Sequence, residues 1–84
     1  MRLDKFLKVS RIIKRRTVAK EVSDAGKISI NGRPAKASTD VKVGDRLVLT
    51  FSGKELEVEI LQVAETMKAD LAKDMYKIIR ESAR

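Results

Sequence analysis

The sequence predicts an α+β domain in which two short amino-terminal helices pack on a small, mostly antiparallel sheet closed by a carboxy-terminal helix. Three observations predict it. Apolar residues recur at helical spacing in residues 3–25, alternate with period two between residues 28 and 60, and return to helical spacing after residue 66. Eighty-four residues suffice for one modest core. We therefore expect residues 1–84 to form one domain, divided into a core (1–50), a sheet extension (51–65) and the closing helix (66–84).

The first helix is expected over residues 3–9, where Leu3, Phe6 and Leu7 form one apolar stripe. An acid in its first turn, Asp4, suits the helix dipole. The second helix is expected from about Arg16 to Ala25, followed by a glycine suited to the left-handed conformation that ends a helix. Its predicted buried stripe is Val18, Ala19, Val22 and Ala25.

From Lys27 onward the spacing becomes that of strands. Asn31-Gly32 is a strong signal for a two-residue hairpin turn, because both residues tolerate the positive φ angles of that turn. Pro34 restricts the return strand to an edge of the sheet. Two further strands are predicted around the turn at residues 52–54, and the second presents Glu55, Glu57 and Glu59 on a wet face. That acidic face is expected to be solvated, to keep RNA away from this side, or to meet a basic ribosomal protein.

The closing helix is predicted over about residues 68–82, with Thr66 as its amino-terminal cap. Its apolar stripe would be Leu71, Met75, Ile78 and Ile79, and Tyr76 would pack beside it.

The positive charge is confined to one half of the chain. Residues 1–36 contain eleven lysines and arginines against three acids, whereas residues 37–84 contain eight against nine. Clustered cations displace counterions from phosphates, so this asymmetry predicts a nucleic-acid partner. Solubility alone requires no such segregation.

The composition disfavours most enzyme classes. The chain has no cysteine and no histidine, so it lacks a disulfide framework, thiolate metal ligands and the commonest general base. We expect no catalytic residue, no metal and no cofactor. No apolar run approaches the ~20 residues of a membrane span, and the amino terminus lacks a secretory signal, so we expect no membrane association and a cytoplasmic location.

The order of residues in the amino-terminal half resembles the S4 RNA-binding domain family, named for ribosomal small-subunit protein four. The resemblance covers residues 1 to about 50 and is carried by Arg2-Leu3-Asp4-Lys5-Phe6-Leu7, Ser10-Arg11, Arg15-Arg16, Ala19, Gly26 and Ile30-Asn31-Gly32. It implies the S4 fold, with its αL-like motif, and an RNA surface formed by both helices and the hairpin. Carried over position by position, the implied RNA-binding residues are Arg2, Lys5, Arg11, Arg15, Arg16, Lys20 and Lys27, with Asn31 and Gly32 at the hairpin tip.

Other charged residues have less specific roles. Asp4 is expected either to stabilise the helix start or to hold Arg2 or Arg16 in position for RNA. The remaining cations of the basic half are expected to add to the general positive field; these are Lys8, Lys14, Arg33 and Lys36.

The short chain leaves no room for a catalytic domain, so we expect a stand-alone member. The start of the chain and its charge-balanced, short tail resemble the RqcP family of ribosome-associated quality-control factors. That resemblance implies large-subunit rRNA, peptidyl-tRNA and an RqcH-type alanine-tailing factor as partners of a monomer. The alternatives are a heat-shock-type S4 protein that recycles blocked large subunits, an RNA-targeting subunit of a separate enzyme, and a DNA-binding architectural protein. The hairpin lacks the apolar wedge that the last of these uses.

Overall fold

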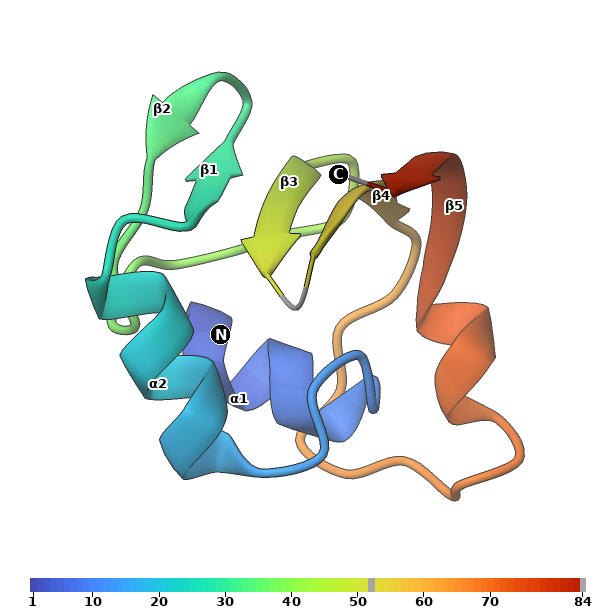
Figure 1. Ribbon diagram of the computed structural model, residues 1–84. Helices are drawn as coiled ribbons and strands as arrows, with labels where there is room; N and C mark the ends of the chain where they lie inside the picture. The colour runs from blue at the N-terminus through green and yellow to red at the C-terminus, as the bar shows by residue number, and fades with distance from the viewer. Residues whose placement is uncertain (52, 84) are drawn as a thin grey trace.

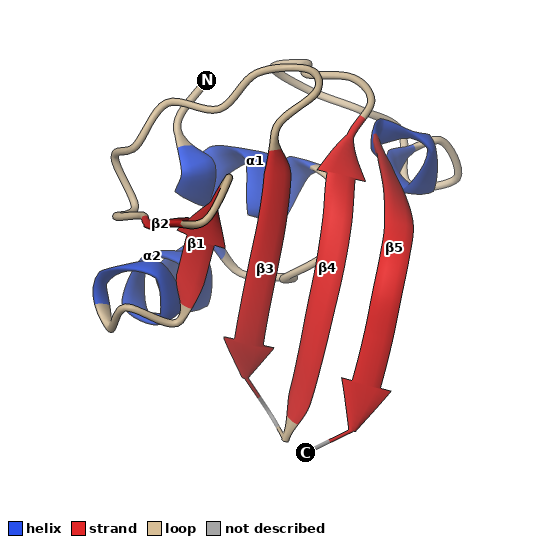
Figure 2. Ribbon diagram, turned by 90° about the horizontal axis from the view of Figure 1, so that it is seen from above, coloured by secondary structure: helices blue, strands red, loops and turns tan. Residues whose placement is uncertain are grey.

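The computed structural model describes residues 1–51 and 53–83, and it has two helices on one side of a five-stranded sheet (Figures 1 and 2). The elements in chain order are α1 (Leu3–Val9), α2 (Arg16–Asp24), β1 (Ile28–Ile30), β2 (Arg33–Pro34), β3 (Arg46–Phe51), β4 (Lys54–Ile60), the 3₁₀ turn η1 (Ala72–Met75) and β5 (Tyr76–Ala83). The α+β class, both amino-terminal helices and the antiparallel sheet are as predicted. No helix in the described part of the chain is long and apolar enough to cross a membrane.

All strand pairs in the sheet are antiparallel, in the order β2-β1-β3-β4-β5. The short strand that contains Pro34 lies at one edge, as a residue without an amide donor requires. The β1–β2 turn has φ angles of 51° at Asn31 and 84° at Gly32, which confirms the predicted hairpin.

The core lies between the helices and the inner face of the sheet. Leu3, Phe6 and Leu7 of α1 are fully buried, as their spacing predicted. The alternating apolar residues of β3 and β4 meet them; the fully buried ones are Leu47, Leu49, Val58 and Ile60. Period-two patterning therefore identified the correct face of each strand.

The predicted stripe of α2 is partly wrong. Ala19 is buried and Val22 is half-buried, but Val18 and Ala25 are exposed. Ser23 lies in the core instead, where its hydroxyl donates to the carbonyl of Ala19 at 2.7 Å. A satisfied hydroxyl can be buried at small cost, so the buried face of this helix is rotated toward Ser23.

The predicted carboxy-terminal helix does not form. Residues 61–71 cross beneath α1, η1 makes a single turn, and β5 pairs with β4 from Tyr76–Ile60 to Ala83–Lys54 (Figure 1). Thr66 caps no helix, and of the predicted stripe only Met75 is fully buried. The β-branched Ile78 and Ile79 suit a strand. Pairing with β5 also gives hydrogen-bond partners to the backbone N–H and C=O groups that β4 would otherwise expose at the sheet edge.

Candidate nucleic-acid interface

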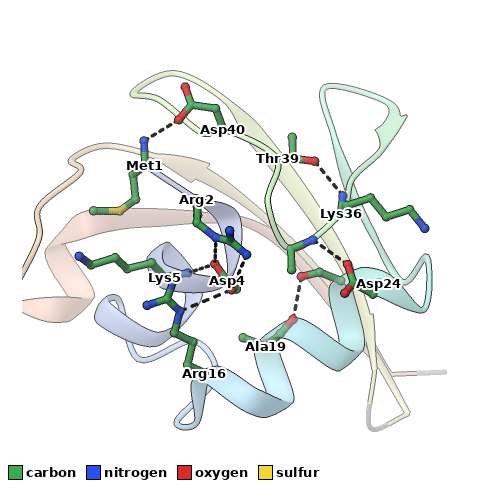
Figure 3. A network of polar contacts seen from close by, with 12 residues as sticks. Met1, Arg2, Asp4, Lys5, Arg16, Ala19, Asp24, Lys36, Thr39 and Asp40 are labelled. Carbon is green, nitrogen blue, oxygen red and sulfur yellow. Dashed lines mark hydrogen bonds and ion pairs between the residues drawn. The ribbon is translucent and has the colours of Figure 1, made fainter.

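Two of the predicted RNA-binding arginines are brought together by one carboxylate. The guanidinium of Arg2 donates two hydrogen bonds to Asp4: from Nε to Oδ1 at 3.1 Å and from Nη2 to Oδ2 at 3.3 Å. Arg16 Nε, at the start of α2, lies 3.4 Å from Asp4 Oδ2 (Figure 3). The Asp4 side chain is 4% exposed, whereas the side chains of Arg2 and Arg16 are 50% and 48% exposed. A buried acid thus holds two arginines that still face solvent.

Asp4 is held ionised by its surroundings. Burial raises the pKa of its carboxyl, but the guanidinium groups of Arg2 and Arg16 and the amide of Lys5 together outweigh burial, so the net pKa lies below its usual value. The Lys5 amide donates to Oδ1 at 2.8 Å. The two roles expected for Asp4, stabilising the helix start and orienting arginines, are therefore filled by the same carboxylate.

The backbone around Arg2 is fixed on both sides. The amino-terminal ammonium of Met1 donates to Asp40 at 2.6 Å (Figure 3). The Leu3 amide donates to the carbonyl of Thr39 at 2.8 Å. Arg2 itself forms a β-bridge with Asp40. The arginine thus projects from an anchored segment.

Lys5 is less available than predicted. Its Nζ forms a hydrogen bond and ion pair with Glu65, and its side chain is 32% exposed. The hydrogen bond and charge of Lys5 lower the pKa of Glu65. Nothing in the sequence signalled this partner, because Glu65 is sixty residues away, at the end of the predicted sheet extension.

The other predicted contact residues divide into two groups. The cations Arg11, Arg15, Lys20 and Lys27 are exposed and, within residues 1–51 and 53–83, form no ion pair. The side chain of Asn31 instead joins the hairpin to β3: its amide donates to Asp45 Oδ1 at 3.1 Å and its oxygen accepts from the Arg46 amide at 3.0 Å. Asn31 therefore fixes the shape of the hairpin, and a Cβ added at Gly32 would meet open space.

The outer face of the sheet is charged but internally paired. Arg80 donates to Glu55 at 2.7 Å and lies 3.6 Å from Glu57, while Arg46 lies 3.9 Å from both Glu57 and Glu59. The three glutamates expected to be solvated are thus flanked by arginines from both neighbouring strands. Because these charges largely cancel, the basic potential is concentrated on the α1–α2 side.

The profile of the S4 domain family matches residues 1–47. The chain therefore belongs to the S4 domain family, which confirms the resemblance found in the order of its residues. The solved structure of Heat Shock Protein 15 from Vibrio cholerae has the same fold, with a TM-score of 0.86 and 30% identity over 93% of this chain and 80% of that one.

Within the family, the chain is similar over nearly its whole length to proteins named RQC P-site tRNA stabilizing factor, the predicted RqcP group. The Bacillus subtilis (strain 168) protein of that name is 58% identical over 81 residues, which cover 96% of this chain and 94% of that protein. A Haemophilus influenzae protein named Heat shock protein 15 homolog is 37% identical over 65 residues, 77% of this chain but only 50% of that protein.

Proposed function

We propose that this protein is a ribosome-associated quality-control factor that binds large ribosomal subunits obstructed by peptidyl-tRNA. It contacts rRNA and tRNA together through the α1–α2 surface and stabilises the tRNA while an RqcH-type factor adds alanine to the stalled chain. It acts in the cytoplasm as a monomer and by positioning RNA, with no covalent step of its own.

The observation that carries the proposal is the pair of half-exposed arginines braced by buried Asp4. A guanidinium binds phosphate oxygens bidentately, and an arginine already fixed by a carboxylate loses less side-chain entropy on binding. Phe6 is buried and therefore offers no stacking surface. Recognition consequently depends on phosphates and RNA shape more than on base identity.

The relatives favour quality control over heat-shock recycling. The alignment spans 94% of the Bacillus subtilis factor but half of the Haemophilus influenzae heat-shock homologue. The chain is thus more similar to the former protein in both identity and aligned extent.

Arg2→Ala and Arg16→Ala test the RNA surface. Each should weaken association with peptidyl-tRNA-bearing large subunits and reduce the slope of log K against log salt by roughly 0.7–0.9 per lost phosphate contact. The matched control is Lys73→Ala, which removes an exposed cation from η1, on the far side of the molecule from α2 (Figure 1). Equal binding by both arginine variants and the control would refute the surface.

Sedimentation of a cell lysate, with tRNA probed across the gradient, tests the ribosomal role. The protein should migrate with large subunits that carry peptidyl-tRNA and should be absent from intact ribosomes. Stable co-migration with an enzyme and no ribosome would instead favour the RNA-targeting subunit.

A further inference from the structure

A basic hollow lies at the carboxy-terminal end of α1. Lys8, Arg11 and Lys14 line one side, and Glu65 and Thr66 of the 61–71 connector line the other. We propose that this hollow is a seat for a single RNA backbone phosphate, held by Lys8, Arg11 and Lys14. The inference rests on the proposed function and gives that RNA surface a second, distinct contact.

The charges in the hollow are available to a ligand. Within the described part of the chain, neither Lys8, Arg11 nor Lys14 forms an ion pair, and all three side chains are exposed. The carboxylate in the lining, Glu65, is already bound by Lys5. Three cations without an ion-pair partner around a small concave space favour the binding of one multiply charged oxyanion.

The size of the hollow suits one phosphate group. Its volume is about 120 Å³. A tetrahedral phosphate group fits a space of this volume.

The segment that carries the cations is rigidly held. Ser10 and Ile13 are buried, the Ser10 hydroxyl donates to the Leu7 carbonyl at 3.3 Å, and the Ile13 amide donates to the same carbonyl at 3.1 Å. Arg11 lies within this anchored stretch and Lys14 directly follows it. Their backbone positions are therefore set before RNA arrives, which reduces the entropy cost of binding.

Arg11 is held in an unfavourable backbone conformation. Its φ angle is 62°, in the left-handed region that glycine adopts without strain. Arg11 directly follows the C-cap Ser10, where helices commonly end in this conformation, and an arginine there costs stability that a glycine would avoid. A glycine would leave the hollow without its guanidinium.

The two contacts lie at opposite ends of α1. The Asp4-braced arginines are at its start, and the hollow is at its end, seven residues and about 10 Å of helix rise away. One α1 helix can thus engage two phosphates at once, either on one RNA strand or on two RNAs that meet at this surface.

The test is Arg11→Gly, measured for stability and for binding in parallel. We expect an equal or higher thermal midpoint, because the strain is relieved, together with about 5- to 20-fold weaker binding to peptidyl-tRNA-bearing large subunits and a salt slope smaller by roughly 0.7–0.9. Lys14→Ala should reduce affinity in the same direction without relieving strain, and Glu65→Gln should increase it by freeing Lys5. Lys73→Ala is the neutral control.

The outcomes separate the two proposals. Weaker binding by Arg11→Gly and Lys14→Ala supports the phosphate seat. Unchanged binding by both, with weaker binding by Arg2→Ala, overturns the seat and leaves the proposed function in place. Unchanged binding by all three overturns both proposals.

Discussion

Replacing Asp4 by asparagine removes the charge that braces Arg2 and Arg16 while preserving the size of the side chain. Asparagine retains an oxygen that can accept from the Lys5 amide, so the change isolates the two guanidinium contacts at 3.1–3.4 Å. Hydrogen bonds to charged groups contribute ~1.5–3 kcal/mol each when shielded. Both arginines are half-exposed, so each contact is reduced by solvent screening. We expect the free energy of unfolding to fall by about 1–2 kcal/mol at pH 7.

Urea unfolding measures this difference in unfolding free energy. It is followed by far-UV circular dichroism, since the chain contains no tryptophan for a fluorescence signal. The folded pKa of Asp4 is depressed, so its stabilising contribution is complete above the unfolded pKa of about 3.9 and is lost as pH falls through the lower folded value. The difference between the original protein and Asp4→Asn should therefore be largest near neutral pH and shrink toward pH 2. Asp70→Asn, in the exposed connector, is the matched control.

Two results would refute this reasoning. Equal stability of the two proteins at pH 7 would mean that the arginines are not held by the carboxylate. A difference that persists unchanged at pH 2 would mean that the asparagine disturbs packing and that charge is not the cause.

Two other substitutions test the fold. Gly32→Ala places a Cβ in open space but at a φ of 84°, so it should cost about 1–2 kcal/mol of unfolding free energy by urea titration; an unchanged midpoint would contradict the turn geometry. Met75→Ala should cost about 2–5 kcal/mol by leaving a cavity, whereas Leu71→Ala, at a side chain 46% exposed, should cost within about 0.5 kcal/mol. Equal losses at Met75 and Leu71 would favour the helical stripe that the sequence predicted.

Local patterns predicted most elements of residues 1–60 because the determinants there are close in sequence. The stripe of α1, the Asn31-Gly32 turn and the alternation in β3 each depend on neighbours within a few residues. The approach of Asp4 to Arg2 and Arg16 was also foreseen as one of two alternatives. The family resemblance predicted that Arg2 and Arg16 lie on one surface, and in the structure both contact the carboxylate of Asp4.

The segment predicted as the closing helix was mispredicted because its structure is decided by a distant partner. The spacing of Leu71, Met75 and Ile78 fits one face of a helix, yet residues from Tyr76 onward pair with β4. Short apolar runs leave helix and strand ambiguous, and here the free edge of β4 and the Arg80–Glu55 contact select the strand. The Lys5–Glu65 contact was missed for the same reason.

Pairing of β5 with β4 has a consequence for how the RNA-binding unit can be isolated. The segment that defines the family ends at residue 47, but the cluster that buries α1 also includes Val58, Ile60 and Met75. A fragment cut at the family boundary would leave the inner surface of α1 without these neighbours and expose an unpaired strand edge. Asp4, which braces both arginines, would then lie on a helix that has lost part of its packing surface. In this chain, the proposed RNA surface depends on packing partners that lie outside the segment carrying the family signature.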